Sequence, residues 1–516
     1  MTEKRPPYDL LIRGGTVIDG TKAPRFQADI GITDGRIAAI GRLDGHGADE
    51  TIDATGLIVA PGFIDSHTHD DQAVLSQALM PFKISQGVTT VITGNCGISA
   101  APLRADMDLP MPLNLIDAPA EGRFTTFAAY LDALRHTPSS VNVAAMVGHS
   151  TLRGVTMSDL DRPASRAEIA VMRAHVEEAM AAGAIGMSTG TFYATAANAT
   201  TEEIIEVGRP LGACGAVYVT HMRDESDKIM EAMEESFAIG RALGVPVVLS
   251  HHKAMHAPNF GKTKVTLPLI QETMKHQCVS VDCYPYTAGS TMIRADRGML
   301  DGRVLIASSE PHPECAGRDL ADIAADWGMS KHDAALQLQP GSAIYFMMDE
   351  DDVQRVLAFD DTMIGSDGLP TGPSPHPRLW GTFPRVLGHY SRDIGLFPLE
   401  TAVWKMTGLT ARNFGLEGRG TLAVGQHADI VVFDAATVRD AATYAAPEQA
   451  AEGIEVVIVN GALTWWAGAS TGARAGQVLA RTRSRLARQP PVDKPVWTAP
   501  GTDSRIASTN RRSFAG

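Results

Sequence analysis

Short apolar segments alternate with amphipathic segments of helical length along the middle of the chain, at steps of roughly 30 residues. Each apolar segment ends in a polar or glycine-rich turn, which is typical of parallel strands joined by helices. Eight such segments close a (β/α)8 barrel, so the sequence predicts an α/β fold with a TIM barrel at its centre. The predicted strands are residues 63–67, 89–93, 142–147, 184–188, 216–221, 245–250, 278–282 and 362–366.

Further short strands are predicted at both ends of the chain. Residues 9–53 are divided by turn dipeptides such as Gly14-Gly15 and Asp34-Gly35, which predicts an antiparallel meander. Strand patterns return after the barrel, and a few short strands are too little for an isolated domain. We therefore expect the two sets to pair into one small discontinuous β-sandwich. The later strands are residues 420–422, 429–434, 454–459 and 463–466.

These patterns divide the chain into four parts. The strand spacing is longer after the second and the seventh barrel strands, which predicts insertions at about 99–127 and 290–359. Loops after barrel strands lie at the catalytic face, so we expect both insertions to shape or cover a substrate pocket. The predicted parts are the first half of the sandwich at 1–61, the barrel at 62–415, the second half of the sandwich at 416–480 and an irregular tail at 481–516.

Charge and composition exclude several classes of protein. The net charge of the 516 residues is −14, which argues against nucleic acid or an anionic membrane as a partner. We find no apolar run of the ~20 residues that a membrane span needs, and Met1–Pro7 does not resemble a signal peptide. Five scattered cysteines without a CxxC motif are poor material for disulfides. We expect a cytoplasmic protein that can form a homo-oligomer.

Side chains that bind zinc follow five of the predicted barrel strands. Two of them are His67 and His69, which point the same way if the strand continues through them. A His-x-His pair alone is weak evidence, but ligand-type residues at five strand ends of one barrel predict a metal site at its catalytic face. The candidate ligands are His67, His69, Cys96, His221, His251 and Asp367.

Several motifs resemble the D-aminoacylases, the N-acyl-D-amino-acid deacylases of the amidohydrolase superfamily. The combination of Asn-Cys-Gly with Ser-His-His-Lys is more selective than His-x-His. The resemblance extends from about residue 9 to 466 and does not include the tail. The segments that carry it are Gly94–Gly97, Ser250–Lys253, Gly365–Gly368, His376–Phe383 and Gly425–Val431.

The resemblance implies how the metals are bound. One Zn²⁺ would be held tightly by Cys96, His221 and His251, and the other three candidates would complete a second, weaker position. Many binuclear members of the superfamily use a carboxylated lysine from the fourth strand as the bridging ligand, but the segment Ala184–Gly190 contains no lysine. The Cys96 thiolate is the natural substitute, because it is soft and able to bridge two zinc ions.

The resemblance also implies the reaction, the zinc-dependent hydrolysis of N-acyl-D-amino acids to a carboxylate and a free D-amino acid. Asp367 would take a proton from the attacking water and give it to the leaving amine, so it is the expected general base and acid. The substrate carboxylate needs a cation or hydrogen-bond donors, and the acyl carbonyl needs donors too. We expect the first from Lys253, Tyr284 and Arg378, and the second from Tyr193 and Ser290.

Two other functions remain open. One is a cyclic-amide hydrolase, similar to hydantoinases, or a D-dipeptide hydrolase of the same superfamily. The other is a scaffold protein without metal or activity. We assign His149 and His252 to structural roles. Three arginines could either sense a charged substrate side chain or pair with neighbouring acids, and they are Arg223, Arg294 and Arg297.

Overall fold

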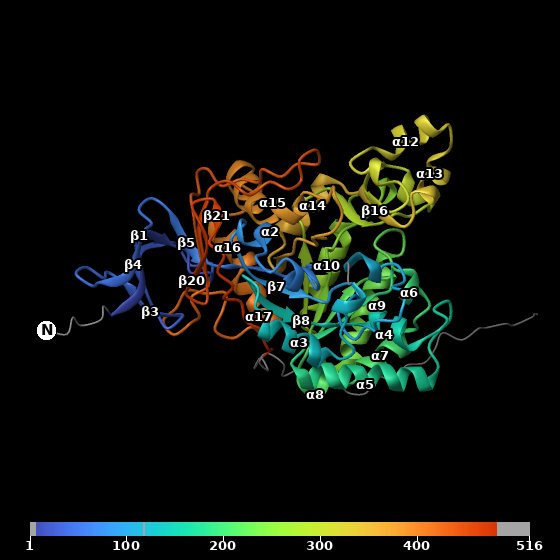
Figure 1. The fold of residues 1–516 in the computed structure, drawn as a ribbon, viewed down its shortest axis with the longest axis horizontal. Coiled ribbons are helices and arrows are strands. Elements are labelled where there is room, and N and C mark those ends of the chain that lie inside the picture. Colours follow the sequence, from blue (N-terminus) through green and yellow to red (C-terminus); the bar gives the residue numbers. More distant parts are fainter. Residues whose placement is uncertain (1–6, 117–118, 482–516) are drawn as a thin grey trace, which may run out of the picture.

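The structure, a computed structural model, describes residues 7–116 and 119–481. The predicted (β/α)8 barrel is confirmed and forms the right-hand part of the molecule in Figure 1. All but the first residue of the predicted tail lie outside the described residues. The barrel strands are β6 (Phe63–Asp65), β7 (Val88–Thr93), β8 (Asn142–Ala145) continued by β9 (Val147–Gly148), β10 (Gly186–Gly190), β11 (Val217–His221), β12 (Val247–Leu249), β13 (Val279–Cys283) and β17 (Thr362–Ile364).

The barrel strands form two parallel arcs that meet end to end. One arc is β6-β7-β8 and the other is β9-β10-β11-β12-β13-β17. Backbone hydrogen bonds close the ring on both sides, from Ile185 N to Ala145 O at 2.9 Å and from Ser66 N to Ile364 O at 3.2 Å. Because all eight positions run in parallel, their C-terminal ends meet at one face. Inside the ring is a packed apolar cluster that includes Ile64, Ile92, Met146, Val219 and Met363.

Helices cover the outside of the barrel (Figure 1). In α5 (Arg166–Ala182), Ser165 and Glu168 form a capping box at the start, and Gly183 ends the helix with a φ of 117°. The other helices are α1 (Ala73–Ser76), α2 (Pro81–Ile84), α3 (Phe127–His136), α4 (His149–Thr156), α6 (Ala194–Ala197), α7 (Thr201–Gly208), α8 (Pro210–Cys214), α9 (Ile229–Leu243), α10 (Thr263–Thr273), α14 (Glu350–Ala358), α15 (Arg378–Arg385), α16 (Leu399–Met406) and α17 (Gly408–Phe414).

Strands from both ends of the chain form one nine-stranded sheet beside the barrel. Its order is β21-β20-β19-β18-β5-β1-β2-β3, and β4 also pairs with β1. The two ends of the chain meet where β5 pairs antiparallel with β18, and the sheet has its own apolar core. The strands are β1 (Tyr8–Val17), β2 (Phe26–Thr33), β3 (Arg36–Gly41), β4 (Ala48–Asp53), β5 (Ile58–Pro61), β18 (Ile430–Phe433), β19 (Ile454–Val459), β20 (Ala462–Trp466) and β21 (Ala469–Ser470).

Three details of the predicted strands are wrong. Gly14-Gly15 is a bulge within β1 and not a turn. The strands β1, β2 and β3 pair antiparallel in chain order, as predicted for a meander, but β4 and β5 pair with β1 in parallel and do not continue it. Residues 420–422 form no strand. Gly418 and Gly420 both have φ near +75°, a left-handed conformation that does not occur in a regular strand.

The segment after β13 forms a small subdomain at the catalytic side of the barrel. Three strands pair antiparallel in the order β14-β16-β15, and helices α12 and α13 pack on them around a separate core. The subdomain is at the upper right of Figure 1. The predicted insertion to residue 359 is too long, because α14 packs on α10, β13 and β17 as a barrel helix. The new elements are β14 (Ala288–Met292), α11 (Arg297–Leu300), β15 (Arg303–Ser309), α12 (Leu320–Trp327), α13 (Lys331–Gln337) and β16 (Gly341–Phe346).

Residues 473–481, the last that the structure describes, form a strap across the other face of the barrel, where the strands begin. Val143 N donates to Gln477 O at 2.9 Å, and Leu479 N donates to Val143 O at 2.8 Å. Arg481 donates to the carbonyls of Gly215 and Asn413. Leu479 also packs against the apolar cluster inside the barrel. The strap therefore covers the end of the barrel that is opposite the catalytic face.

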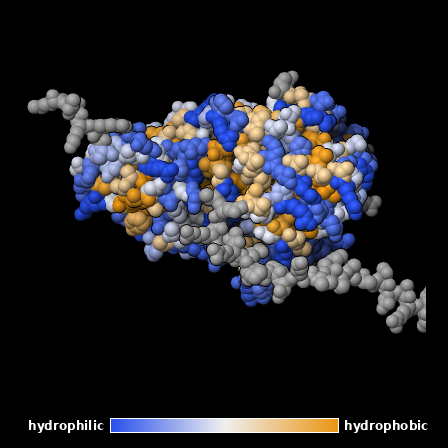
Figure 2. Space-filling view, turned by 90° about the horizontal axis from the view of Figure 1, so that it is seen from below, coloured by the Kyte–Doolittle hydropathy of each residue, from blue (hydrophilic) through white to orange (hydrophobic). Residues whose placement is uncertain are grey.

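The surface carries no single large apolar element among the described residues. Large exposed hydrophobic side chains come from separate parts of the fold, for example Val171, Val265, Leu336 and Val424. Figure 2 shows hydrophobic areas on one face that are separated by hydrophilic ones. Within residues 7–116 and 119–481, no helix has the length and apolar character needed to cross a membrane.

Candidate active site

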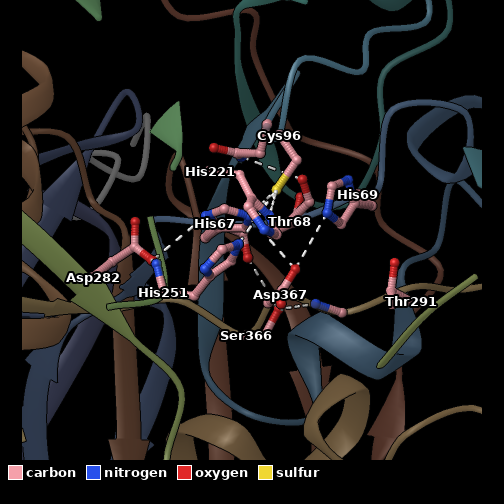
Figure 3. A network of polar contacts seen from close by, with 12 residues as sticks. His67, Thr68, His69, Cys96, His221, His251, Asp282, Thr291, Ser366 and Asp367 are labelled. Atoms are coloured by element: carbon pink, nitrogen blue, oxygen red, sulfur yellow. Dashed lines mark hydrogen bonds and ion pairs between the residues drawn. The ribbon is translucent and has the colours of Figure 1, made fainter. Parts of the chain in front are cut away.

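All six candidate ligands are buried and lie together at the catalytic face of the barrel (Figure 3). They come from five strand ends, as the sequence predicts. His67 and His69 follow β6, Cys96 follows β7, His221 ends β11, His251 follows β12 and Asp367 follows β17.

Three of these ligands lie on left-handed backbone turns. The φ angles are 53° at Cys96, 34° at His251 and 50° at Asp367. Residues other than glycine seldom adopt this conformation, which costs on the order of 1–3 kcal/mol each and is concentrated at functional sites. A positive φ therefore occurs at a ligand shortly after three of the barrel strands, β7, β12 and β17. The sequence gives no sign of this strain.

The Asn-Cys-Gly motif has a steric basis. A Cβ atom at Gly94 would lie 2.0 Å from Met146 O, and one at Gly97 would lie 2.6 Å from Ser150 Oγ. Asn95 donates to Ile92 O at 2.8 Å and to Thr68 O at 3.3 Å, so it ties the Cys96 loop to the residue between His67 and His69. The motif therefore positions one ligand and braces two others.

The thiolate position is shared by two groups of ligands. Cys96 Sγ lies 3.3 Å from His67 Nε2, 3.5 Å from His251 Nε2 and 3.6 Å from His221 Nδ1. Two ligands of one tetrahedral zinc ion, bound at normal lengths, are about 3.5 Å apart. The measured separations fit this value. The first group is therefore Cys96 with His221 and His251.

The second group contains Cys96 again, with Asp367 and the His-x-His pair. Asp367 Oδ1 lies 3.2 Å from His69 Nε2 and 3.5 Å from His67 Nε2. Figure 3 shows Cys96 and Asp367 on opposite sides of the histidine rings. The residues present thus fit two metal positions with the thiolate between them.

Charges in the site favour the ligand forms of the cysteine and the aspartate. Burial opposes ionisation of the Cys96 thiol, but His67 and His251 outweigh it and hold its pKa well below the usual range. Burial opposes ionisation of Asp367 too, and there the Arg378 guanidinium, 2.9 Å from Oδ2, is the main group that lowers the pKa. Both side chains are therefore ready to bind a cation.

Two buried carboxylates behind the ligands were missed by the sequence analysis. Asp282 Oδ1 lies 3.5 Å from His67 Nδ1 and accepts from His251 N at 2.6 Å. Glu225 lies 3.1 Å from His251 Nδ1 and 3.4 Å from His221 Nε2. Such carboxylates orient metal-binding imidazoles. Only their place, at the end of β13 and just beyond β11, could have pointed to them.

A buried lysine was also missed. Lys83 Nζ lies 2.7 Å from Asp65 Oδ2, 3.2 Å from Asp70 Oδ2 and 2.9 Å from Ser366 Oγ. Asp65 in turn accepts from Ser366 N at 2.8 Å. This cluster joins the segment that carries His-x-His to the segment that carries Asp367. No motif around Lys83 indicates such a contact, because Asp65 and Asp70 precede it by more than ten residues and Ser366 is far away along the chain.

The predicted substrate residues surround the ligands. Four of them, Tyr193, Lys253, Tyr284 and Ser290, line a cavity together with His221, His251 and Asp367. The fifth, Arg378, lies over the Tyr284 ring at 4.5 Å and pairs with Asp367. Lys253 pairs with Glu225 at 2.6 Å. The remaining wall of the cavity is largely apolar and includes Phe192, Met255, Met299 and Met347.

Other titratable residues considered from the sequence lie elsewhere or have partners. His149 contacts Glu203 at 3.3 Å, and His252 lies 2.8 Å from Thr266 Oγ1 with its pKa lowered to about 4 by burial. Arg223 pairs with Glu235. Arg294 pairs with Asp296 and lies over the Phe192 ring at 4.4 Å, beside the cavity. The side chain of Arg297 lies outside the described part.

Known proteins share this fold and sequence. A model of the amidohydrolase family matches residues 50–282 and 329–464. The D-aminoacylase of Alcaligenes xylosoxydans xylosoxydans is 62% identical over 476 residues, which are 92% of this chain and 98% of that protein. A solved D-aminoacylase with a binuclear metal centre has a TM-score of 0.91 at 60% identity and covers 92% of this chain and 100% of its own.

One further solved structure is the N-acyl-D-glutamate deacylase from Bordetella bronchiseptica, bound to zinc and to a phosphonate that mimics the tetrahedral intermediate. It has a TM-score of 0.89 at 45% identity, over 92% of this chain and 100% of its own. The motifs, the fold and these relatives agree, and the chain belongs to the D-aminoacylases of the amidohydrolase family.

Proposed function

We propose that this chain hydrolyses N-acyl-D-amino acids, with zinc, to a carboxylate and a free D-amino acid. The observation that carries the proposal is a cysteine shared by two ligand groups, whose members His221, His251 and Asp367 line a cavity that also contains a lysine and two tyrosines. The relatives with the same fold are D-aminoacylases and an N-acyl-D-glutamate deacylase, one of them bound to zinc. A scaffold without metal would not need these ligands.

We assign the tight zinc position to Cys96, His221 and His251. The weaker position uses the same thiolate with the other three ligands. When bound, zinc supplies a Lewis acid that polarises the acyl carbonyl and lowers the pKa of water to about 7. The protein contributes the placement of the ligands, and the carboxylates of Glu225 and Asp282 hold the imidazoles in orientation.

Asp367 moves the proton in this proposal. Its carboxylate takes a proton from the attacking water and gives it to the nitrogen of the scissile amide, which leaves as a free amine. Arg378 keeps the carboxylate ionised before water attacks. An amide nitrogen is a poor leaving group without this proton, so the reaction depends on the shuttle.

The remaining residues bind the substrate. Lys253 and Tyr284 line the cavity and Arg378 lies over the Tyr284 ring, so the substrate carboxylate would find two cations and a hydroxyl group there. Tyr193 and Ser290 are placed to donate to the acyl oxygen. The remaining lining of the cavity is largely apolar, so we propose that the preferred D-side chain is apolar.

A kinetic panel tests this function. We expect acetate to be released from N-acetyl-D-methionine and not from its L-enantiomer. The kcat/KM should be higher for the N-acetyl derivatives of D-Leu, D-Met and D-Phe than for those of D-Asp and D-Glu. The second candidate, a cyclic-amide or D-dipeptide hydrolase, predicts turnover of hydantoins or D-dipeptides instead. Activity on a cyclic amide together with none on any N-acyl-D-amino acid would reject our proposal.

We further propose that the enzyme works in the cytoplasm on a small-molecule substrate, without nucleic acid or membrane as a partner. The acidic net charge of −14 supports the second part. We also propose a homo-oligomer as the state to be tested, by light scattering of the purified protein.

A further inference from the structure

One buried carboxylate, that of Glu225, contacts both the metal ligands and a lysine of the substrate cavity. Glu225 has an exposed fraction of 0% and contacts three site residues through its two oxygens. Oε1 lies 3.1 Å from His251 Nδ1, and Oε2 lies 3.4 Å from His221 Nε2. The same Oε2 lies 2.6 Å from Lys253 Nζ. Two metal-binding imidazoles and the cation of the substrate pocket therefore share one counter-ion.

The contacts set complementary tautomers on the two histidines. His221 presents Nδ1 to Cys96 Sγ and turns Nε2 to Glu225, whereas His251 presents Nε2 to Cys96 and turns Nδ1 to Glu225. The nitrogen that faces the metal position must be unprotonated, so the other nitrogen of each ring carries the proton and faces a carboxylate oxygen of Glu225. Lys253 Nζ lies 2.8 Å from the same His251 Nδ1, so the carboxylate also separates two groups that both carry protons. Glu225 has one oxygen for each ring.

The contact with Lys253 sets the position of the ammonium group. Lys253 Nζ also donates to His251 O at 3.1 Å and lies 6.0 Å from the centre of the Tyr284 ring. The side chain is buried but lines the cavity. A buried cation without a counter-ion is costly, so removing the Glu225 charge would release Lys253 from this position.

We propose that Glu225 is a positioning residue that couples metal binding to substrate binding, by orienting His221 and His251 for zinc while it holds Lys253 toward the substrate carboxylate. The inference rests on the proposed function for its substrate half only. Glu225 contacts the ligands and not the reacting atoms, so it acts through them. Its backbone supports the same region, because Met255 N donates to Glu225 O at 2.8 Å.

The test compares Glu225→Gln with the wild-type holoenzyme in two measurements. Zinc retained after dialysis against a chelator reports on the histidines, and we expect affinity to fall about 10- to 100-fold, as for other buried partners of zinc ligands. KM for N-acetyl-D-methionine reports on Lys253, and we expect it to rise about tenfold at full zinc occupancy. Zinc retention and KM equal to those of the wild type would overturn the proposal.

A double-mutant cycle separates the two roles. In a Lys253→Met background, Glu225→Gln should change KM less than twofold, while its effect on zinc retention should be unchanged. An equal rise of KM in both backgrounds would show that Glu225 does not act through Lys253, and would refute the coupling. The zinc measurement needs no turnover, so it stands even if the wild-type protein proves to have a different substrate.

Two further variants control for folding. Glu225→Asp keeps the charge and should recover part of the zinc retention that Glu225→Gln loses. Glu203→Gln removes a comparably buried carboxylate that pairs with His149 and Arg153 and contacts no metal ligand. We expect this control to lose stability but to keep zinc and KM. Loss of zinc from Glu203→Gln as well would mean that any buried charge supports the site, and would contradict a special role of Glu225.

Discussion

Asp367 is the residue on which the proposed chemistry depends most. Asp367→Asn keeps the size of the side chain but cannot accept the proton of water, so we expect kcat to fall by about 10³-fold. The tight zinc position should stay filled, because its three ligands are unchanged. Steady-state kinetics and metal analysis check both parts. As a control, Asp361→Asn makes the same substitution at the residue just before β17 and should leave kcat unaltered. A kcat of Asp367→Asn near that of the wild type would show that Asp367 is not the general base and acid.

Cys96 differs from the histidines because both ligand groups contain it. We expect Cys96→Ala to remove all zinc, whereas His69→Ala should keep about one zinc per chain. Metal analysis of the purified variants measures this. Cys283 provides a matched control, since it is a buried cysteine whose Sγ donates to Tyr284 O and binds no candidate ligand. Cys283→Ala should keep the full metal content. A zinc-bearing Cys96→Ala protein would refute the shared thiolate.

The ligands could be predicted from the sequence because each lies at the end of a strand that hydrophobic pattern alone reveals. Glu225 could not, because its contact with His251 forms only when the loops after β11 and β12 come together, and Lys83 could not, because Ser366 reaches it only in the closed barrel. The left-handed turns at Cys96 and Asp367 have no sequence signal either, since neither residue is a glycine. Sequence patterns therefore predicted the ligands but not the groups that orient them.

At the scale of elements, a buried ion cluster fastens α4 to α7. Glu203 on α7 bonds Arg153 and lies 3.3 Å from His149, both on α4. Burial raises the pKa of Glu203, but His149, the Ala164 amide and Arg153 outweigh it and lower the pKa from 4.5 to about 2. A lowered pKa means that the carboxylate stabilises the fold fully above about pH 4.5 and loses this effect as pH falls toward 2.

We therefore expect Glu203→Gln to have a lower free energy of unfolding than the wild type at pH 7. This difference in unfolding free energy should become smaller as the pH falls from 4.5 to 2. Denaturant unfolding followed at pH 7, 5, 4 and 3 measures it. A difference that is the same at every pH would show that packing, and not the charge of Glu203, connects the two helices.

The strand register shows what short-range patterns leave out. Gly14-Gly15 is a frequent turn dipeptide, and only the pairing of β1 with β2 on both sides of it reveals a bulge. The parallel partners of β1 likewise depend on strands brought together by the fold. The barrel was easier to predict, because each of its units repeats the same local pattern.

At the scale of the molecule, the strap of residues 473–481 should stabilise the barrel. A Cβ atom at Gly476 would lie 2.0 Å from Val141 O, which is backbone and cannot move aside. We expect Gly476→Ala to lower the unfolding free energy by about 1–3 kcal/mol, with kcat unchanged at temperatures where the protein is folded. Thermal unfolding measures this. Gly298→Ala is the control, because the nearest atom lies at 3.9 Å, and an equal loss there would contradict a specific effect of the strap.

The strap also provides a site for attaching the enzyme to a support without blocking the cavity. Arg481 donates hydrogen bonds to the carbonyls of Gly215 and Asn413 at the closed end of the barrel. The ligands lie at the other end, where the cavity is. A tether or a solid surface bound to the strap itself lies on the side of the barrel that faces away from the incoming substrate. Immobilised in this orientation, the enzyme would keep its entrance toward the solution, which suits it to the resolution of racemic N-acyl amino acids in a packed bed.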